Sequence, residues 1–137
     1  MIFHIAICSP DPVLRGRVQR HCLEYYARRA DACIVEQLES AADLLRQEAD
    51  GTRYELYLIE LTASCPAAGL QAAAQLRQHG VRAPLAFFAR TPAYAYEAFR
   101  VDAMQYLQIS FRPEQLTALL DRATEPEYGP VIPVTTA

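Results

Sequence analysis

Short apolar runs alternate along this chain with stretches in which apolar residues recur at helical spacing. Three runs, Phe3–Cys8, Tyr54–Leu61 and Leu85–Phe88, are almost continuously hydrophobic, which is typical of strands buried on both faces of a sheet. Weaker strand patterns cover Cys33–Leu38 and Met104–Gln108. The pattern therefore predicts five strands, each followed by a segment of crossover length.

The segments between the predicted strands carry helical patterns and helix-start signals. Ser40 is a plausible N-cap, and Pro113 suits the first turn of a last helix. In the helix expected over 94–101, the apolar side is formed by Ala95, Ala98 and Phe99. Strands that alternate with helices in this way indicate an α/β fold, with a parallel sheet covered by helices on both faces.

Length and composition limit the organisation of the protein. The chain has 137 residues, of which 52% are hydrophobic and 21% charged, enough to build the core of one domain. The expected domain covers residues 1–124, and residues 125–137 are expected to be a linker or the start of a following domain because their composition changes to a Pro- and Gly-containing pattern.

Charge and hydropathy exclude several classes of partner. The formal net charge is −3 and the arginines are scattered, so direct nucleic-acid binding by this domain is not expected. No apolar run is long enough to span a membrane, and nothing resembles a signal peptide. We therefore expect a cytoplasmic protein with reduced thiols and no membrane partner.

The sequence resembles CheY-like response-regulator receiver domains, and within them the subgroup joined to LytTR-type DNA-binding domains. The resemblance implies a doubly wound, flavodoxin-like sheet with strand order 2-1-3-4-5 and a role in two-component signalling. It covers roughly residues 2–123. It is carried by Ile5–Cys8 with Asp11-Pro12, by Tyr54–Ile59, by Gly69-Leu70, by Tyr94–Phe99 and by Val101–Leu107.

The resemblance also implies which positions would carry receiver chemistry. That chemistry requires two acidic residues that hold Mg²⁺, an Asp that accepts the phosphoryl group, a Thr or Ser that senses it, and a Lys that pairs with it. Here the acidic pair falls on Ser9 and Pro10, and the acceptor on Glu60. The remaining two positions fall on Ala89 and Ile109. Because every position departs from the family pattern, we expect no phosphorylation, no bound metal and no cofactor.

Some neighbouring residues could compensate for these losses. Asp11 follows the acidic pair by one position, but we favour a role as helix N-cap over one in metal binding. Counted back from Gly69, the acceptor would be Leu61 instead of Glu60. Glu60 either imitates a phosphorylated Asp or is a solvated strand-end carboxylate, and we favour the latter. Arg90 could replace the missing cation, although a solvated loop residue is the simpler interpretation.

Other chemistry finds less support in the sequence. The histidines are dispersed, no nucleophile has a partner at a meaningful spacing, and no enzymatic activity is expected. Pro10 and Pro12 remove backbone donors from the first loop, which disfavours a flavin or nucleotide site. Cys8 ends the first predicted strand and Cys65 lies in the loop after the third, so both are expected near the same edge of the sheet. A switch that responds to redox state or to a small molecule is therefore the alternative to a binding module.

If the pocket is inert, function is expected on a surface. In receivers this surface is formed by the fourth helix, the fifth strand and the fifth helix, and it supports a homodimer or the binding of a regulatory protein. Tyr and Arg are enriched at interaction hot spots, although the tyrosines could equally cover neighbouring helices. The candidate interface residues are Tyr94, Tyr96, Glu97, Arg100, Asp102, Gln105, Gln108, Arg112, Gln115 and Asp121.

Overall fold

Five parallel strands form one sheet in the order β2-β1-β3-β4-β5, which confirms the fold class and strand order expected from the sequence. The computed structural model describes residues 2–124; the expected linker at 125–137 lies outside them. The elements are β1 (Ile2–Cys8), α1 (Pro12–Ala27), β2 (Ala32–Leu38), α2 (Ala41–Ala49), β3 (Leu56–Leu61), α3 (Pro66–Gln78), β4 (Leu85–Ala89), a 3₁₀ turn η1 (Pro92–Tyr94), α4 (Ala95–Arg100), β5 (Gln105–Gln108) and α5 (Pro113–Thr124).

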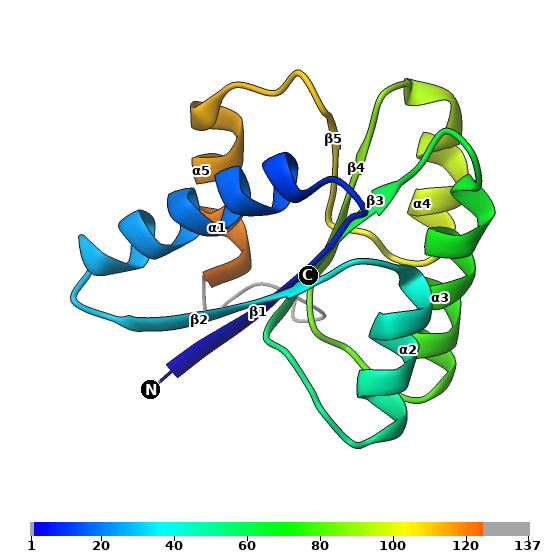
Figure 1. Cartoon of the computed structure of the whole chain (residues 1–137), viewed down its shortest axis with the longest axis horizontal. Helices are drawn as coiled ribbons and strands as arrows, with labels where there is room; N and C mark the ends of the chain where they lie inside the picture. The colour runs from blue at the N-terminus through cyan, green and yellow to red at the C-terminus, as the bar shows by residue number, and fades with distance from the viewer. Residues whose placement is uncertain (1, 125–137) are drawn as a thin grey trace, which may run out of the picture.

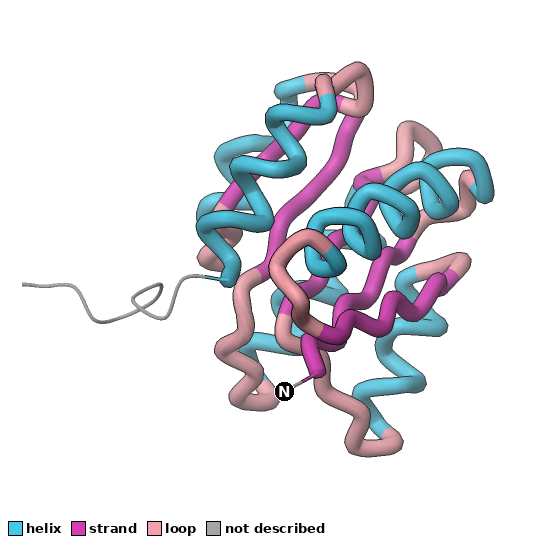
Figure 2. The backbone as a smooth tube through the Cα atoms, turned by 90° about the vertical axis from the view of Figure 1, so that its left-hand side faces the viewer, coloured by secondary structure: helices cyan, strands magenta, loops and turns pink. Residues whose placement is uncertain are grey.

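The helices form two layers on opposite faces of the sheet (Figures 1 and 2). Helices α1 and α5 cover one face, and α2, α3 and α4 cover the other. Neighbouring residues of the central strands serve different layers: Phe88 packs with α1 and α5, whereas Phe87 packs with α2 and α3. The sheet is therefore buried on both faces, which explains the almost continuous apolar runs of its central strands.

Two helix starts are as the sequence predicted. The Val13 N–H donates to Oδ1 of Asp11 at 2.9 Å, so Asp11 is the N-cap of α1. Ser40 caps α2 through a hydrogen bond from the Asp43 N–H at 3.2 Å. Each side chain satisfies a backbone donor that the first helical turn leaves without a partner.

The helix expected over 94–101 differs from its prediction. It begins with the 3₁₀ turn η1, and of the proposed apolar side only Ala98 is buried. Ala95 is exposed, and 75% of Phe99 is accessible to solvent. The prediction of a three-residue apolar side was wrong because α4 is short and contacts the sheet mainly through one alanine.

Candidate functional site

Ser9 and Glu60 meet at the edge of the sheet where the strands end. Ser9 follows β1, and Glu60 is the penultimate residue of the neighbouring strand β3. The buried Ser9 hydroxyl donates to Oε1 of Glu60 at 2.5 Å, and the Ser9 N–H donates to the Leu38 carbonyl at 2.9 Å. Two of the residues that the sequence assigned to the pocket are therefore joined directly.

The loop after Ser9 engages the other polar atoms nearby. The Asp11 N–H donates to the Ser9 hydroxyl at 3.0 Å, while the Asp11 carboxylate serves the first turn of α1. Nη1 of Arg15 donates to the Ser9 carbonyl at 2.7 Å, and its Nε donates to Gln37 at 3.1 Å. Arg15 is thus a cation beside the pocket, and our sequence interpretation did not identify it. Its position four residues after the helix cap Asp11 was the feature of the sequence that could have identified it.

The remaining pocket positions carry no polar side chain. Ala89 ends β4 and is buried, and its carbonyl accepts the Ile109 N–H at 2.8 Å. The Ile109 side chain packs against the core layer of α1 and α5. Leu61 is buried in the opposite layer, so Glu60 is the strand-end residue whose side chain reaches the rim.

These residues do not fit a magnesium ion. Pro10 has no side-chain oxygen, and the Asp11 carboxylate is turned toward the helix terminus. The Ser9 hydroxyl already donates to Glu60 and accepts from the Asp11 N–H. Mg²⁺ prefers carboxylate oxygens and water in octahedral geometry. Within residues 2–124, no group of three or more His, Cys, Asp or Glu side chains could hold a metal ion.

The cysteines differ in their exposure. Cys8 is buried, and its burial together with the charge of Glu60 raises the pKa of the thiol from 9.0 to about 12, despite an opposing effect of Arg15. Burial also raises the pKa of Cys22, and that of Cys33 to about 11. Cys65 is exposed at the start of α3. Because the thiolate is the reactive form, Cys8 has little nucleophilic character at neutral pH.

Most of the candidate interface residues lie on the surface of α4, β5 and α5. Tyr96, Glu97 and Arg100 are exposed on α4, and the Arg100 guanidinium lies 6.0 Å from the Tyr96 ring centre. Tyr94 is half-buried against the α2–α3 layer. Asp102 is exposed after the helix.

Four further candidates lie on or near β5 and α5. Gln108 is exposed at the end of β5, and Arg112 and Gln115 are exposed at the start of α5. Gln105 is half-buried and accepts a hydrogen bond from Arg122 at 2.7 Å. Gln108, Arg112 and Gln115 are therefore accessible to solvent, and Gln105 is partly accessible.

Asp121, the last of the candidate interface residues, forms hydrogen bonds within the domain. Its Oδ1 accepts hydrogen bonds from the Tyr25 hydroxyl at 2.5 Å and from Nη2 of Arg29 at 3.0 Å. Both partners belong to or follow α1, so Asp121 joins α5 to α1 and does not face α4. The spacing of residues along α5 predicts which side chains share one side of the helix. It does not tell whether that side meets α1 or belongs to the candidate interface.

A groove lies between α4 and β5. It has a volume of about 270 Å³ and is lined mainly by apolar residues, among them Phe99, Met104 and Tyr106. The Tyr106 hydroxyl donates to the Thr91 carbonyl at 2.6 Å across the start of η1. Phe99, which the sequence interpretation placed on the apolar side of the helix, is therefore an exposed apolar residue beside a groove.

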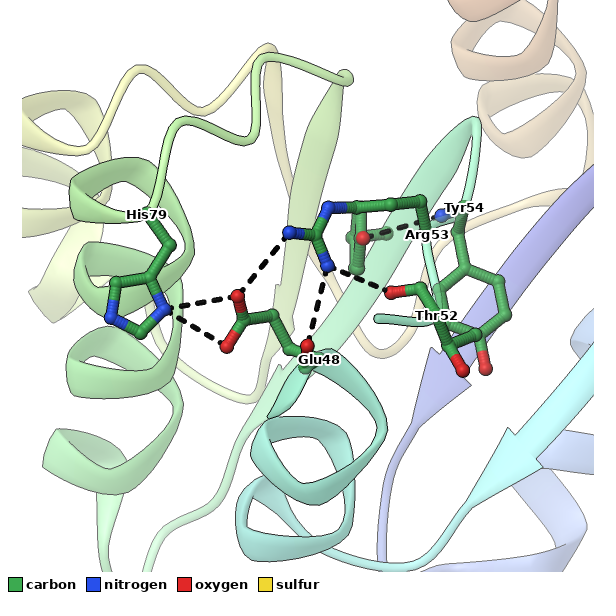
Figure 3. A network of polar contacts seen from close by, with 6 residues as sticks. Glu48, Thr52, Arg53, Tyr54 and His79 are labelled. Atoms are coloured by element: carbon green, nitrogen blue, oxygen red, sulfur yellow. Dashed lines mark hydrogen bonds and ion pairs between the residues drawn. The ribbon is translucent and has the colours of Figure 1, made fainter. Parts of the chain in front are cut away.

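A second polar cluster lies at the far ends of α2 and α3 (Figure 3). Glu48 is 7% exposed, and Nδ1 of His79 lies 2.9 and 3.0 Å from its two carboxylate oxygens. Nη2 of Arg53 is 3.5 Å from Oε2 of the same residue. The half-exposed His79 and Arg53 thus surround one buried carboxylate and join α2, α3 and the segment before β3.

Comparison with known proteins gives likenesses of structure only. The sequence matches no family model and no curated protein. The response regulatory domain of mrkE from Klebsiella pneumoniae is similar with a TM-score of 0.76 at 13% identity, over 89% of this chain and 95% of that one. TrrA from Thermotoga maritima, in complex with Mg²⁺-BeF, has a TM-score of 0.72 at 17% identity, over 88% and 98% of the two chains.

A response regulator receiver protein from Pseudoalteromonas atlantica also has a TM-score of 0.72, at 16% identity, covering 88% of this chain and 95% of that one. No helix in the described part of this chain is long and apolar enough to cross a membrane. At such low identities the likeness concerns the arrangement of the backbone and not the residues of the pocket. The chain has the fold of response-regulator receiver domains.

Proposed function

We propose that this chain is a receiver-type signalling domain that acts without phosphorylation, by binding a second copy of itself or a regulatory protein. The observation that carries the proposal is the hydrogen bond from Ser9 to Glu60. It occupies the polar atoms at the position where receiver chemistry needs a cation site and a free acceptor. The domain is then a binding module and not an enzyme.

The charges around Glu60 support this proposal. A phosphoryl group carries about two negative charges, which a receiver pocket offsets with a metal ion and an ammonium group. Here Ile109 occupies the position of that ammonium group, and Arg15 is bound to backbone and amide oxygens. Glu is also one methylene longer than Asp, which shifts its carboxylate from the geometry needed for in-line attack.

The binding surface that we propose is the face formed by α4, β5 and α5. It exposes Tyr96 and Phe99 beside Arg100, and aromatic and Arg side chains dominate many interaction hot spots. The resemblance of Tyr94–Leu107 to regulators with LytTR domains supports a place in a cytoplasmic transcription regulator. DNA binding would then belong to another domain, because the arginines of this one are scattered.

The rival function is a redox or small-molecule switch on the same fold. Burial and the neighbouring Glu60 disfavour a reactive thiol at Cys8, because they raise its pKa to about 12. Cys65 is exposed, but we find no partner thiol bonded to it. No contact among the described residues favours this function over a binding module.

Treatment with a phosphoryl donor tests the proposal. The protein is incubated with acetyl phosphate and Mg²⁺, or with beryllofluoride, and followed by intact mass and by NMR shifts around Glu60. TrrA, whose structure contains Mg²⁺-BeF, is the positive control. We expect no mass change and no shift in this chain, together with self-association or partner binding that is the same with and without the donor. A stable acyl phosphate would refute the proposal.

A further inference from the structure

Helix α4 is held to the rest of the domain by few apolar contacts. Of its six residues only Ala98 is buried, and Tyr96 and Phe99 are 70% and 75% exposed. Segments with little buried apolar surface open locally at low free-energy cost. Polar contacts at its two ends can therefore contribute substantially to its position.

At the N-terminal end, one hydroxyl group secures the turn that precedes α4. The Tyr106 hydroxyl on β5 donates to the Thr91 carbonyl at 2.6 Å. The Thr91 hydroxyl in turn accepts the Ala93 N–H at 3.2 Å and caps η1. This end is thus attached to β5 through the hydroxyl group of Tyr106.

At the C-terminal end, the guanidinium of Arg77 binds the turn between α4 and β5. Its Nε donates to the Val101 carbonyl at 3.0 Å, and its Nη2 donates to the Asp102 carbonyl at 3.1 Å. Its Nη1 donates to Val81 at 3.0 Å and to Ala83 at 2.8 Å, on the turn between α3 and β4. One side chain of α3 therefore joins two turns that are distant in sequence.

The turn bound by Arg77 has an unusual backbone. Asp102 has a φ of 59°, in the left-handed region that few residues other than glycine adopt. Around it, the N–H groups of Asp102, Ala103 and Met104 donate to the carbonyls of α4 and β4 at 3.0, 3.3 and 2.8 Å. Met104 also lines the groove between α4 and β5. A contact that stabilises this turn consequently fixes one wall of the groove.

We infer that Arg77 is a positioning residue that fixes the α4–β5 turn onto α3 and so keeps the α4–β5–α5 face in one shape without a phosphoryl group. The inference rests on the proposed function in one respect, because that proposal identifies the α4–β5–α5 face as the binding surface. A preorganised surface loses less conformational entropy on binding, so its affinity does not need an activating event. The planar fork of Arg is required because its several N–H groups reach carbonyls of two turns at once, which a Lys ammonium cannot do.

Amide hydrogen exchange of the full chain tests the inference. We expect Arg77→Met to accelerate exchange at residues 101–104 by at least about tenfold, with the amides of β1 and β3 changing little, because a local fastening is lost. Arg82→Met is the matched control: within residues 2–124, Arg82 donates hydrogen bonds to the carbonyls of Arg77 and Val81, both at 3.3 Å, and to no carbonyl of the α4–β5 turn. In Arg82→Met, the amides of the α4–β5 turn should exchange as in the wild type.

Arg77→Lys separates positioning from charge. We expect it to exchange like Arg77→Met, because it keeps the positive charge but loses the fork. Wild-type exchange at 101–104 in both Arg77 variants would overturn the inference, as would full recovery in the Lys variant. If Arg77→Met does not fold, Arg77→Lys decides the question alone, since it retains the charge and most of the side-chain volume.

Sedimentation equilibrium of the same proteins distinguishes this inference from the proposed function. We expect weaker self-association or partner binding in Arg77→Met by at least about fivefold, through the lost preorganisation. A wild-type chain that binds neither itself nor a protein partner would refute the proposed function. Faster amide exchange at 101–104 in Arg77→Met would still establish that Arg77 holds the α4–β5 turn. Unchanged affinity in a variant whose turn exchanges faster would overturn the link between Arg77 and the binding face.

Discussion

The hydroxyl group of Ser9 donates a 2.5 Å hydrogen bond to the carboxylate of Glu60, and this contact links the ends of β1 and β3. The two residues are separated by 51 positions in sequence, and Ser9 is buried. In a phosphorylatable receiver, the same edge would hold acidic side chains around a metal ion. Here the Ser9 hydroxyl and the Glu60 carboxylate bind each other, so this edge of the sheet is held together by a contact within the domain.

We predict that Ser9→Ala lowers the free energy of unfolding by about 1–2 kcal/mol, because a hydrogen bond to a charged group is lost. Urea denaturation measures the change. In a Glu60→Ala background the same substitution should cost at least about 0.5 kcal/mol less, since the two side chains act as a pair. Additive effects of the two substitutions would show that the hydrogen bond does not contribute to stability.

Thiol labelling should follow exposure and pKa. We predict that a disulfide reagent at neutral pH modifies Cys65 first and leaves Cys8 and Cys22 unmodified until the protein unfolds. Mass spectrometry of proteolytic fragments identifies the sites, and Cys65→Ser is the control that should remove the fast phase. Rapid native modification of Cys8 would contradict the assigned burial.

Stability should decrease at alkaline pH. The pKa of Cys8 is raised in the folded state from 9.0 to about 12, so the folded protein retains this proton longer than the unfolded chain does. The stability from this group is fully present below pH 9 and is lost as the pH rises toward 12. We expect urea midpoints to fall over this range, and to fall less in Cys8→Ala. An equal decline in both proteins would exclude a contribution from Cys8.

Two helical glycines should respond oppositely to alanine. A Cβ at Gly69 would lie 2.8 Å from Cδ2 of Leu61 and 3.3 Å from the Glu60 carbonyl oxygen, so the buried Leu61 side chain or the backbone beside it must shift. We predict that Gly69→Ala destabilises the protein by about 1–3 kcal/mol. Gly16 in α1 has no atom within 4 Å of such a Cβ, and Gly16→Ala should stabilise by about 0.5–1 kcal/mol. Thermal denaturation of both variants provides the comparison.

The cluster around Glu48 should contribute to the attachment of α2. Glu48→Gln keeps the size of the side chain but removes the charge that faces His79 and Arg53. We predict a loss of about 1–2 kcal/mol in the free energy of unfolding, because charge-assisted hydrogen bonds become neutral ones. Glu39, which is exposed, offers a control position where the same change should have little effect. Equal effects at both positions would exclude a special role for the cluster.

The proposed binding face is tested by charge at Phe99. Phe99→Asp should weaken self-association or partner binding at least about tenfold, because truncating an aromatic hot spot costs about 2 kcal/mol or more. Its stability should stay near that of the wild type, since 75% of the side chain is exposed. Val13, which is 76% exposed on α1, is the matched control, and Val13→Asp should bind normally. Equal binding by both variants would place the interface elsewhere.

The apolar pattern was sufficient to predict the order of strands and helices in this protein. Runs such as Leu85–Phe88 are apolar at successive positions because adjacent side chains enter opposite core layers. Few other kinds of secondary structure produce that pattern. The helix starts at Asp11 and Ser40 were predictable because an N-cap acts on residues two or three positions away. These are local effects, and the sequence displays them directly.

Boundaries and surfaces depended on contacts across the fold. Phe99 has the spacing of a core residue, yet α4 is too short to bury it. The side of α5 occupied by Asp121 was set by its hydrogen bonds to Tyr25 and Arg29, which lie more than 90 positions earlier. Helical periodicity predicts that a residue is on a surface, but it does not tell which neighbouring helix that surface meets.

The sequence by itself predicted the strand and helix order and the residue types at the positions where the resemblance implies receiver chemistry, because residue identity alone decides whether an oxygen or an amine is present. Only the tertiary structure decided what the remaining groups do. Ser9 binds Glu60, Arg15 binds the Ser9 carbonyl and Arg77 binds two separate turns because the strands bring together segments that are far apart along the chain. Hydrogen bonds act over about 3 Å, and the separation of two residues in the sequence does not tell whether they come that close in the fold.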